Sequence, residues 1–265
     1  MNNTPKTALR PLTIVKVGGA IVEDGNELAL LLAKFAALSG PKILVHGGGR
    51  TATKLASSLG ITTQMVGGRR ITDNEMLRIV TMVYGGLVNK NIVAQLQQRQ
   101  VNALGLTGAD MDIITSHRRP PRDGIDYGLV GDIDRVNTPI LTRLLNDGVT
   151  PILAPLTHDG RGQILNTNAD TIAASVAYAL ASVFRVTLVY IFEKPGVLAN
   201  PDDDSSLIPL ITRPLLQQYV ADGTISGGML PKVQNALEAV EKGVDSVVIQ
   251  QVEALGTGFG TTVKA

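Results

Sequence analysis

Short runs of β-branched residues alternate with longer helical patterns along this chain, and that alternation restricts its fold more than any other feature. The predicted strands are 13–17, 42–46, 150–154, 186–191 and 246–249. The predicted helices are 27–38, 51–59, 74–98, 138–146, 170–183 and 232–242. Strands that alternate with helices form a mainly parallel sheet with helices packed against it. The sequence therefore predicts an α/β fold.

Two segments depart from this alternation. Residues 107–136 are broken by Gly, Pro and Asp, which predicts hairpins laid beside the main sheet. Residues 61–72 carry Gly67-Gly68 at their centre, which predicts a smaller hairpin. We expect a boundary near Pro155, with residues 1–155 and 156–265 as two lobes of one continuous sheet.

Composition excludes several classes of function. Lys and Arg number 24 against 23 Asp and Glu, so the chain lacks the basic excess of a nucleic-acid binder. The basic run 117–122 is rich in Pro and has no aromatic neighbours. Disulfides and Cys-ligated metals are excluded because there is no Cys, and the three His are far apart. We expect neither a nucleic-acid partner nor a metal site built from the chain's own side chains.

Residues 172–192 are long enough to cross a bilayer and carry one charge, Arg185. Their first half is rich in Ala at helical spacing, and their second half is β-branched and aromatic. We interpret them as a helix followed by a strand. The N-terminus has no continuous apolar stretch typical of a signal peptide, so we expect a cytoplasmic protein without a membrane segment.

Glycine-rich loops follow the first two predicted strands. The first reads K-V-G-G (Lys16, Gly18, Gly19), and the second reads H-G-G-G-R at 46–50. Ligands of α/β sheets bind beyond the carboxyl ends of the strands, where bare amides and helix N-termini attract anions. Each loop alone is also explained as a tight turn, but two consecutive ones favour anion binding. Lys16, a cation in an otherwise apolar strand, also favours anion binding.

Arg69 and Arg70 come just before the long helix. A guanidinium can clamp a carboxylate through two parallel hydrogen bonds. The two residues alone are better explained as a solvated surface pair. A bound ligand therefore remains an open alternative at this point.

Two other helix starts carry polar residues of interest. Asn166 is a loop amide with no evident structural need, and Asn168 is a candidate N-cap that leaves Asp170 in the first helical turn. Lys232 follows S-G-G-M-L-P and also lies in a first turn. A cation there opposes the helix dipole, which indicates a bound anion nearby.

These motifs occur in an order that resembles the amino acid kinase superfamily and, within it, the N-acetylglutamate kinase family. The motifs are K-V-G-G, H-G-G-G, G-R-R-I-T, N-T-N-A-D and S-G-G-M-L-P-K, and the likeness extends from Thr13 to the C-terminal G-T-G-F-G-T-T-V. The resemblance implies a three-layer αβα sandwich around a mainly parallel sheet of about eight strands. Residues 1–155 would bind the acyl-amino acid, and residues 156–265 would bind MgATP.

The implied reaction is ATP-dependent phosphorylation of the side-chain carboxylate of N-acetyl-L-glutamate, giving N-acetyl-L-glutamyl 5-phosphate for arginine biosynthesis. The resemblance assigns catalysis to Lys16, Lys232 and Asp170, the last holding both lysines; substrate binding to Gly48, Gly49, Arg70 and Asn166; and nucleotide binding to Gly18, Gly19, Lys194, Gly196, Ser226 and Gly227. A carboxylate with a pKa of about 4.3 is ionised at neutral pH and needs no general base. Mg²⁺, the one implied cofactor, would bridge the ATP phosphates and need few protein ligands.

The sequence departs from the family pattern in two places. The loop 192–196 reads F-E-K-P-G where relatives carry an aspartate, which makes Lys194 available to ATP phosphates. Arg69 stands where the family often has an apolar residue. An extra cation suits an extra carboxylate, so N-succinyl-L-glutamate is an alternative substrate. The acidic loop 201–206 is expected to be solvated.

Two other functions are alternatives to this one. The first is another superfamily kinase that acts on a free acidic amino acid, but the motif N-T-N-A-D favours an acylated substrate. The second is a non-catalytic nucleotide sensor, which would be expected to lack Lys16 or Lys232, whereas both are present. Only about a dozen residues precede the first strand. Arginine-inhibited members of the family carry an extra N-terminal helix, so the resemblance implies a homodimer that arginine does not inhibit.

Overall fold

An eight-stranded sheet forms the centre of the computed structural model, which describes residues 9–227 and 229–265. Its strand order is β12-β14-β13-β11-β1-β2-β8-β5. The strands are β1 Pro11–Val17, β2 Lys42–His46, β5 Ala103–Leu106, β8 Thr150–Leu153, β11 Arg185–Ile191, β12 Leu210–Ile211, β13 Ser246–Gln250 and β14 Thr261–Val263. Neighbouring strands are parallel except β13 and β14. The predicted mainly parallel sheet is confirmed.

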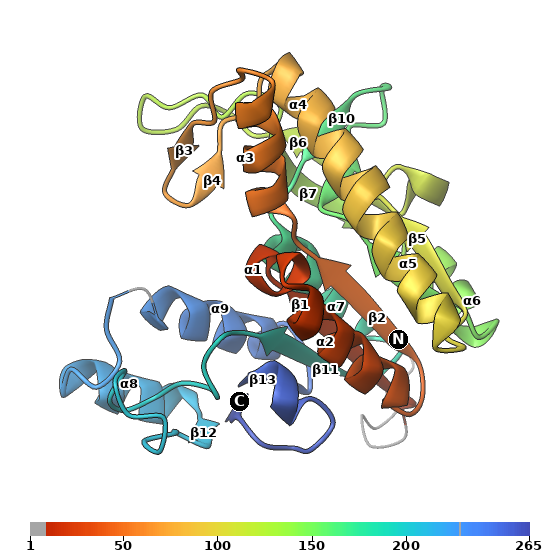
Figure 1. The fold of residues 1–265 in the computed structure, drawn as a ribbon. Coiled ribbons are helices and arrows are strands. Elements are labelled where there is room, and N and C mark those ends of the chain that lie inside the picture. Colours follow the sequence, from red (N-terminus) through yellow and green to blue (C-terminus); the bar gives the residue numbers. More distant parts are fainter. Residues whose placement is uncertain (1–8, 228) are drawn as a thin grey trace.

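Helices cover both faces of this sheet (Figure 1). One layer holds α6 Thr138–Asn146, α7 Ala169–Leu180, α8 Arg213–Ala221 and α9 Met229–Glu241. The other holds α1 Gly19–Glu23, α2 Gly25–Ala37, α3 Gly49–Ser58, α4 Asn74–Val80, the π-helical η2 Thr81–Val88 and α5 Asn89–Gln98. Short 3-10 turns lie at η3 Asp110–Asp112 and η4 Val252–Ala254. The arrangement confirms the predicted three-layer αβα sandwich.

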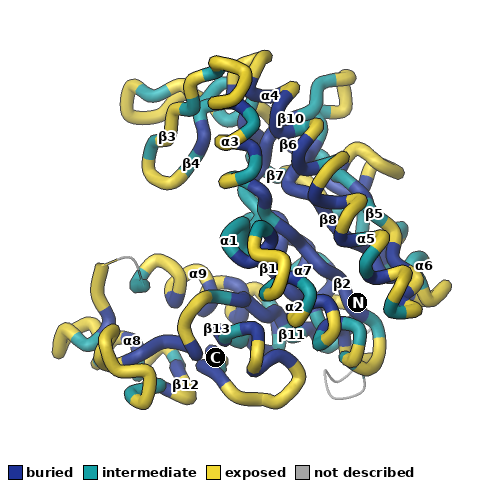
Figure 2. The backbone as a smooth tube through the Cα atoms, viewed as in Figure 1, coloured by how far each residue is buried: buried dark blue, intermediate teal, exposed yellow. Residues whose placement is uncertain are grey.

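The strand residues explain why the sheet is buried on both sides. In β1, Ile14 packs with the α7 and α9 layer, whereas Val15 and Val17 pack with the α2 and α3 layer. Successive side chains of a strand point to opposite faces, so Lys16 shares the face of Ile14. Figure 2 shows the central strands as a buried band between more exposed helices. Lys16 therefore enters the α7 side of the core at the carboxyl edge of the sheet.

The predicted hairpins form two smaller sheets. The first has the order β10-β9-β6-β7, from β6 Ile114–Arg118, β7 Gly131–Val136, β9 Leu156–His158 and β10 Ile164–Asn166. The second pairs β3 Met65–Val66 with β4 Arg69–Arg70. Gly67 and Gly68, between them, have φ values of 54° and 74°, the left-handed conformation that glycine adopts at little cost.

Seven helices and strands of the described residues were not predicted: α1, α8, β5, β9, β10, β12 and β14. β5 reads A-L-G-L and has no β-branched residue, so its strand conformation depends on pairing with β8. The long helix predicted at 74–98 has the right bounds, but its centre is π-helical. Residues 172–192 divide between α7 and β11, as interpreted from the sequence. Within the described ranges, no helix has both the length and the apolarity that crossing a membrane requires.

His46 ends β2 and is completely buried. Its Nδ1 lies 2.7 Å from the Gly47 carbonyl oxygen, and its Nε2 lies 3.1 Å from Asn89 Nδ2. A carbonyl only accepts and this amide nitrogen only donates, so the ring fits as a neutral imidazole that donates from Nδ1. Burial lowers the pKa of His46 to about 4, partly opposed by the Gly47 hydrogen bond.

We predict that His46 makes the fold sensitive to acid. Its folded pKa of about 4 lies below the ordinary 6.5, so the unfolded chain takes up the proton first. Its contribution to the free energy of unfolding is complete above about pH 6.5 and is lost toward pH 4, by about 3 kcal/mol in all. Urea unfolding across this range measures it. His46→Gln should flatten the dependence, whereas exposed His117→Gln should not; an equally steep His46→Gln profile would contradict the assignment.

Candidate active site

Two cavities open near the carboxyl ends of β1 and β2. The glycine-loop cavity, of about 170 Å³, is lined by Gly48, Gly49, Arg70, Tyr84 and Asn166 among others. The lysine cavity, of about 310 Å³, is lined by Lys16, Gly18, Phe192, Lys194, Gly196 and Lys232 among others. All four predicted substrate-binding residues therefore lie together, and both predicted catalytic lysines face one cavity.

The two glycine loops that line these cavities touch each other. A Cβ placed on Gly47 would lie 3.1 Å from the Gly19 nitrogen, and one placed on Gly19 would lie 3.4 Å from the Gly49 nitrogen. Such contacts need residues without side chains, because the neighbouring atoms belong to the backbone. Gly19 is therefore needed for loop packing, while Gly18 lines the lysine cavity.

Arg70 is buried rather than part of a solvated surface pair, with 7% of its surface exposed. Its Nη2 donates to the Gly49 carbonyl oxygen at 2.8 Å and to Thr53 Oγ1 at 2.9 Å. Its Nη1 donates to Thr63 Oγ1 at 3.2 Å and contacts Met76 Sδ at 3.7 Å. Both terminal nitrogens thus have protein partners. A substrate carboxylate clamped through them would have to replace at least one of these contacts.

Asn166 also has a structural partner, which the sequence did not indicate. Its Nδ2 donates to Thr72 Oγ1 at 2.9 Å, and that hydroxyl donates to the Arg70 carbonyl oxygen at 3.1 Å. These bonds tie β10 to the chain leaving the β3–β4 hairpin. Asn166 is nearly buried, so the tie fixes it at the cavity wall.

Lys16 and Asp170 form an ion pair between the sheet and α7. Lys16 Nζ lies 2.8 Å from Asp170 Oδ1 and forms an ion pair with it. The angles at these two atoms do not fit a hydrogen bond. The Asn168 side chain caps α7 as predicted, accepting from the amides of Asp170 at 2.8 Å and Thr171 at 3.1 Å. About half of the Asp170 side chain remains exposed. The cap therefore sets where this carboxylate meets the lysine.

Lys232 lies in the first turn of α9 and is exposed. Its Nζ is 4.4 Å from the centre of the Phe192 ring. Among the described residues, Asp170 pairs with Lys16 and makes no ion pair with Lys232. The expected contact of Asp170 with Lys16 is present. Its expected contact with Lys232 stays a prediction, since α9 places Lys232 against the Phe192 ring in this structure.

The predicted nucleotide residues are only partly gathered. Lys194 and Gly196 line the lysine cavity and, with Ser226, a neighbouring cavity of about 130 Å³. Gly227 lines neither and adopts φ 55° beside residue 228, which lies outside the described residues. Lys194 Nζ lies 2.9 Å from Asp204 Oδ1. The acidic loop 201–206 is exposed, as expected, but it also holds Lys194.

Gly196 is explained by packing. A Cβ at this position would lie 2.5 Å from Leu207 Cδ1 and 2.6 Å from Thr261 Oγ1. Thr261 is fully buried, and its Oγ1 accepts from the Val197 amide at 2.8 Å. A side chain at 196 would therefore disturb the base of the loop, whatever that loop binds.

A sequence model described as the amino acid kinase family matches residues 11–251. The chain belongs to the amino acid kinase family. It is 60% identical over 253 residues to an acetylglutamate kinase of Bacteroides thetaiotaomicron, covering 96% of this chain and 98% of that protein.

Two solved structures share this amino acid kinase fold. Smu.665 from Streptococcus mutans UA159 superposes with a TM-score of 0.75 at 27% identity, covering 96% of this chain and 98% of that one. N-acetylglutamate synthase from Neisseria gonorrhoeae, complexed with coenzyme A and N-acetyl-glutamate, gives 0.80 at 24% identity. That match covers 97% of this chain and 59% of the synthase chain, and it concerns the fold alone.

Sequence reasoning missed Tyr84, which this amino acid kinase buries in the wall of the glycine-loop cavity. Tyr84 comes from the π-helical η2, and such segments are rare and frequent at functional sites. A Cβ on Gly48 would lie only 2.9 Å from Tyr84 Cδ1. Burial raises the pKa of the Tyr84 hydroxyl, and the nearby Arg70 opposes that shift. An available signal was Y-G-G within a helix, since glycine there is costly.

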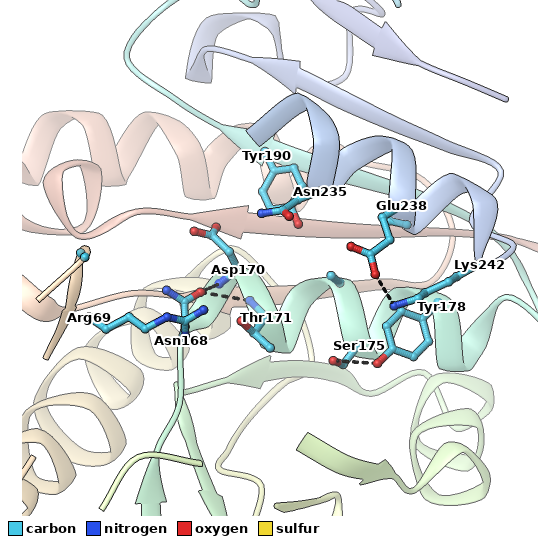
Figure 3. A pocket seen from close by; sticks show the side chains of 14 residues that line it. Arg69, Asn168, Asp170, Thr171, Ser175, Tyr178, Tyr190, Asn235, Glu238 and Lys242 are labelled. Carbon is cyan, nitrogen blue, oxygen red and sulfur yellow. Dashed lines mark hydrogen bonds and ion pairs between the residues drawn. The ribbon is translucent and has the colours of Figure 1, made fainter. Parts of the chain in front are cut away.

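Arg69 lies on the wall that the glycine-loop cavity shares with a third cavity, of about 360 Å³, between the hairpin, α7 and α9. Figure 3 shows Arg69 reaching from the hairpin toward Asn168, with Asp170 and Tyr190 further along. Burial and then repulsion by Arg119 lower the pKa of Arg69, partly offset by Asp132. Asp132 accepts instead from Arg119 Nε at 3.0 Å. Within the described part of the chain, Arg69 has no carboxylate partner.

We predict that Gly48→Ala lowers both stability and affinity for the acyl-amino acid. The added methyl group meets the Tyr84 ring, and overpacking of this kind costs about 1–3 kcal/mol. Urea unfolding and the KM for the acceptor measure the two effects. Gly25→Ala, which adds a methyl group in open space at the start of α2, is the matched control. Gly48→Ala with the stability and KM of the parent chain would contradict the close packing.

Proposed function

We propose that this amino acid kinase transfers the γ-phosphoryl group of ATP to the side-chain carboxylate of N-acetyl-L-glutamate. The product is N-acetyl-L-glutamyl 5-phosphate, an intermediate of arginine biosynthesis. The observation that carries the proposal is that two touching glycine loops each line a cavity, one that also holds Arg70 and Asn166 and one that also holds Lys16 and Lys232. The 60% identical acetylglutamate kinase supports the choice of acceptor.

The chemistry needs positive charge and positioning more than proton transfer. The acceptor carboxylate is ionised at neutral pH, and one of its oxygens attacks the γ-phosphorus. The bond from that phosphorus to the bridging oxygen breaks, and ADP leaves with the electron pair. Negative charge accumulates on the transferring group, where Lys16 and Lys232 from opposite ends of the chain would stabilise it.

The remaining residues would orient the reactants. Amides of Gly48 and Gly49 would hold the acceptor, and Arg70 and Asn166 would contact its acylated amino-acid part. Gly18 would approach the phosphates closely. Asp170 would keep Lys16 aimed at the lysine cavity, through the ion pair described above.

The nucleotide would occupy the lysine cavity and the neighbouring one lined by Lys194, Gly196 and Ser226. In this proposal, residues 1–155 form the acceptor lobe and also contribute Lys16 and Gly18 to the lysine cavity. Residues 156–265 form the nucleotide lobe and also contribute Asn166 to the acceptor site. No group of three or more His, Asp or Glu suited to a metal occurs in the described residues. Mg²⁺ would instead be bound mainly by the ATP phosphates and by water molecules. The exposed Asp170 oxygen would help to hold it by accepting a hydrogen bond from one of these waters. Mg²⁺ supplies charge neutralisation of the phosphates.

We also propose a cytoplasmic homodimer. Met82 and Leu87 of η2 each expose 53% of their surface, although the same helix buries Val83, Tyr84 and Val88. Exposed apolar side chains of this size on one helix favour burial against a second copy. Light scattering after gel filtration gives the mass of the assembly, and Met82→Lys should shift it toward the monomer.

A second candidate substrate is N-succinyl-L-glutamate. The observation that favours it is Arg69, a half-buried cation on the glycine-loop cavity with no carboxylate partner among the described residues. The succinyl group carries one more carboxylate than the acetyl group. A guanidinium facing the acyl end would bind that group with two charge-assisted hydrogen bonds.

We predict hydroxamate formation from ATP and N-acetyl-L-glutamate, and none from free glutamate or aspartate. Lys16→Ala and Lys232→Ala should each lower kcat by about 100-fold or more, because each removes charge stabilisation worth about 2.7–4 kcal/mol. Lys242→Ala is the control, since this lysine directly follows α9 but contacts Glu238 and does not line the lysine cavity. An unchanged kcat for Lys232→Ala would remove that residue from the chemistry.

We predict that Arg69→Leu discriminates between the two acyl groups. Loss of hydrogen bonds to a charged partner should lower kcat/KM for N-succinyl-L-glutamate about tenfold or more and change that for N-acetyl-L-glutamate much less. Initial rates on both substrates provide the comparison, with exposed Arg122→Leu as control. Equal losses on both substrates, or no turnover of the succinyl compound, would remove the second candidate.

A further inference from the structure

Phe192 lies at the carboxyl edge of the sheet, on the same face as Lys16. Lys16 pairs in register with Tyr190 on the neighbouring parallel strand β11, so both side chains point toward α7 and α9. Phe192 comes two residues later and stacks on Tyr190, with ring centres 6.2 Å apart and planes at 28°. Its amide donates to the Gln250 carbonyl oxygen at 2.9 Å. The ring is therefore held at the mouth of the lysine cavity from two sides.

The two lysines of that cavity are held by different means. Lys16 has a carboxylate at 2.8 Å, whereas Lys232 Nζ lies 4.4 Å from the centre of the Phe192 ring. No carboxylate in the described residues forms an ion pair with Lys232, although Glu193 follows Phe192 directly. The face of an aromatic ring attracts an ammonium group without cancelling its charge. Lys232 is thus oriented and keeps a full positive charge facing the cavity.

This difference has a chemical consequence for phosphoryl transfer. A carboxylate partner would compete with phosphate for the ammonium group and would repel the incoming nucleotide. An aromatic face does neither, and it gives up the ammonium at a cost of about 0.5–2 kcal/mol. Lys16, a second cation, lines the same cavity as Lys232. Because the two positive charges repel each other, the Lys232 ammonium group needs an orienting group before ATP arrives.

We propose that Phe192 is a positioning residue that orients the Lys232 ammonium group over the lysine cavity for contact with the transferring phosphoryl group. The inference rests on the proposed kinase function and names a residue that acts through Lys232. Phe192 itself would touch none of the reacting atoms.

The kinetic test compares Phe192→Leu with Phe192→Tyr. Removing the ring should lower kcat about 3- to 30-fold and leave the KM for N-acetyl-L-glutamate within twofold, whereas Phe192→Tyr keeps an aromatic face and should stay near the parent kcat. Phe259→Leu, at an exposed phenylalanine, is the control. In a Lys232→Ala background, Phe192→Leu should have little additional effect, because the two residues act as one unit. Independent, multiplying losses would overturn the proposal.

A second readout does not depend on activity. Reductive methylation with ¹³C-formaldehyde keeps each lysine charged and gives it an NMR signal, which Lys232→Arg assigns by its loss. The Phe192 ring should shift the Lys232 signal upfield, Phe192→Leu should abolish that shift, and Phe192→Tyr should keep it. A signal that Phe192→Leu leaves unmoved would overturn the contact in solution. If the parent chain makes no acyl phosphate, the proposed function fails, while this measurement still tests the contact.

Discussion

The ion pair between Lys16 and Asp170 is the interaction on which the rest of the site depends. A lysine that is only 8% exposed in an otherwise apolar strand is costly unless a counter-charge stands beside its ammonium group. That counter-charge comes from the first turn of α7, where the Asn168 cap fixes the start of the helix. Two layers of the sandwich are thereby joined at the carboxyl edge of the sheet, where both cavities open.

The two cavities hold their positively charged side chains by different means. The glycine-loop cavity has its guanidinium tied to backbone and hydroxyl oxygens, which keeps Arg70 rigid and buried. The lysine cavity keeps one cation paired and one against an aromatic face. Between the two glycine loops, backbone amides approach closely because glycines stand on both sides. A preorganised arrangement of this kind stabilises developing charge without moving at the moment of reaction.

Much of the site could be predicted because its residues occupy local positions that sequence patterns reveal. Lys16 is anomalous in its strand, Asn168 is a cap, and the glycine loops follow strands. Other features could not be read from the sequence. Arg70 was better explained as a surface residue, because its four partners come from α3, the following loop and α4. Tyr84 was missed because the π-helical turn that buries it is set by packing around it.

The sequence by itself determined five strands of the central sheet, most of the helices between them and the hairpins at 61–72 and 107–136, because hydrophobic period, caps and glycine turns act over a few residues. Only the tertiary structure decided the strand order, the short strand β5, and the partners of Lys232 and Lys194. Those features depend on contacts between residues far apart in the chain, and a local pattern carries no information about such contacts. For the same reason, the contact of Lys232 with the Phe192 ring, which the packing of α9 produces, could not be read from the sequence.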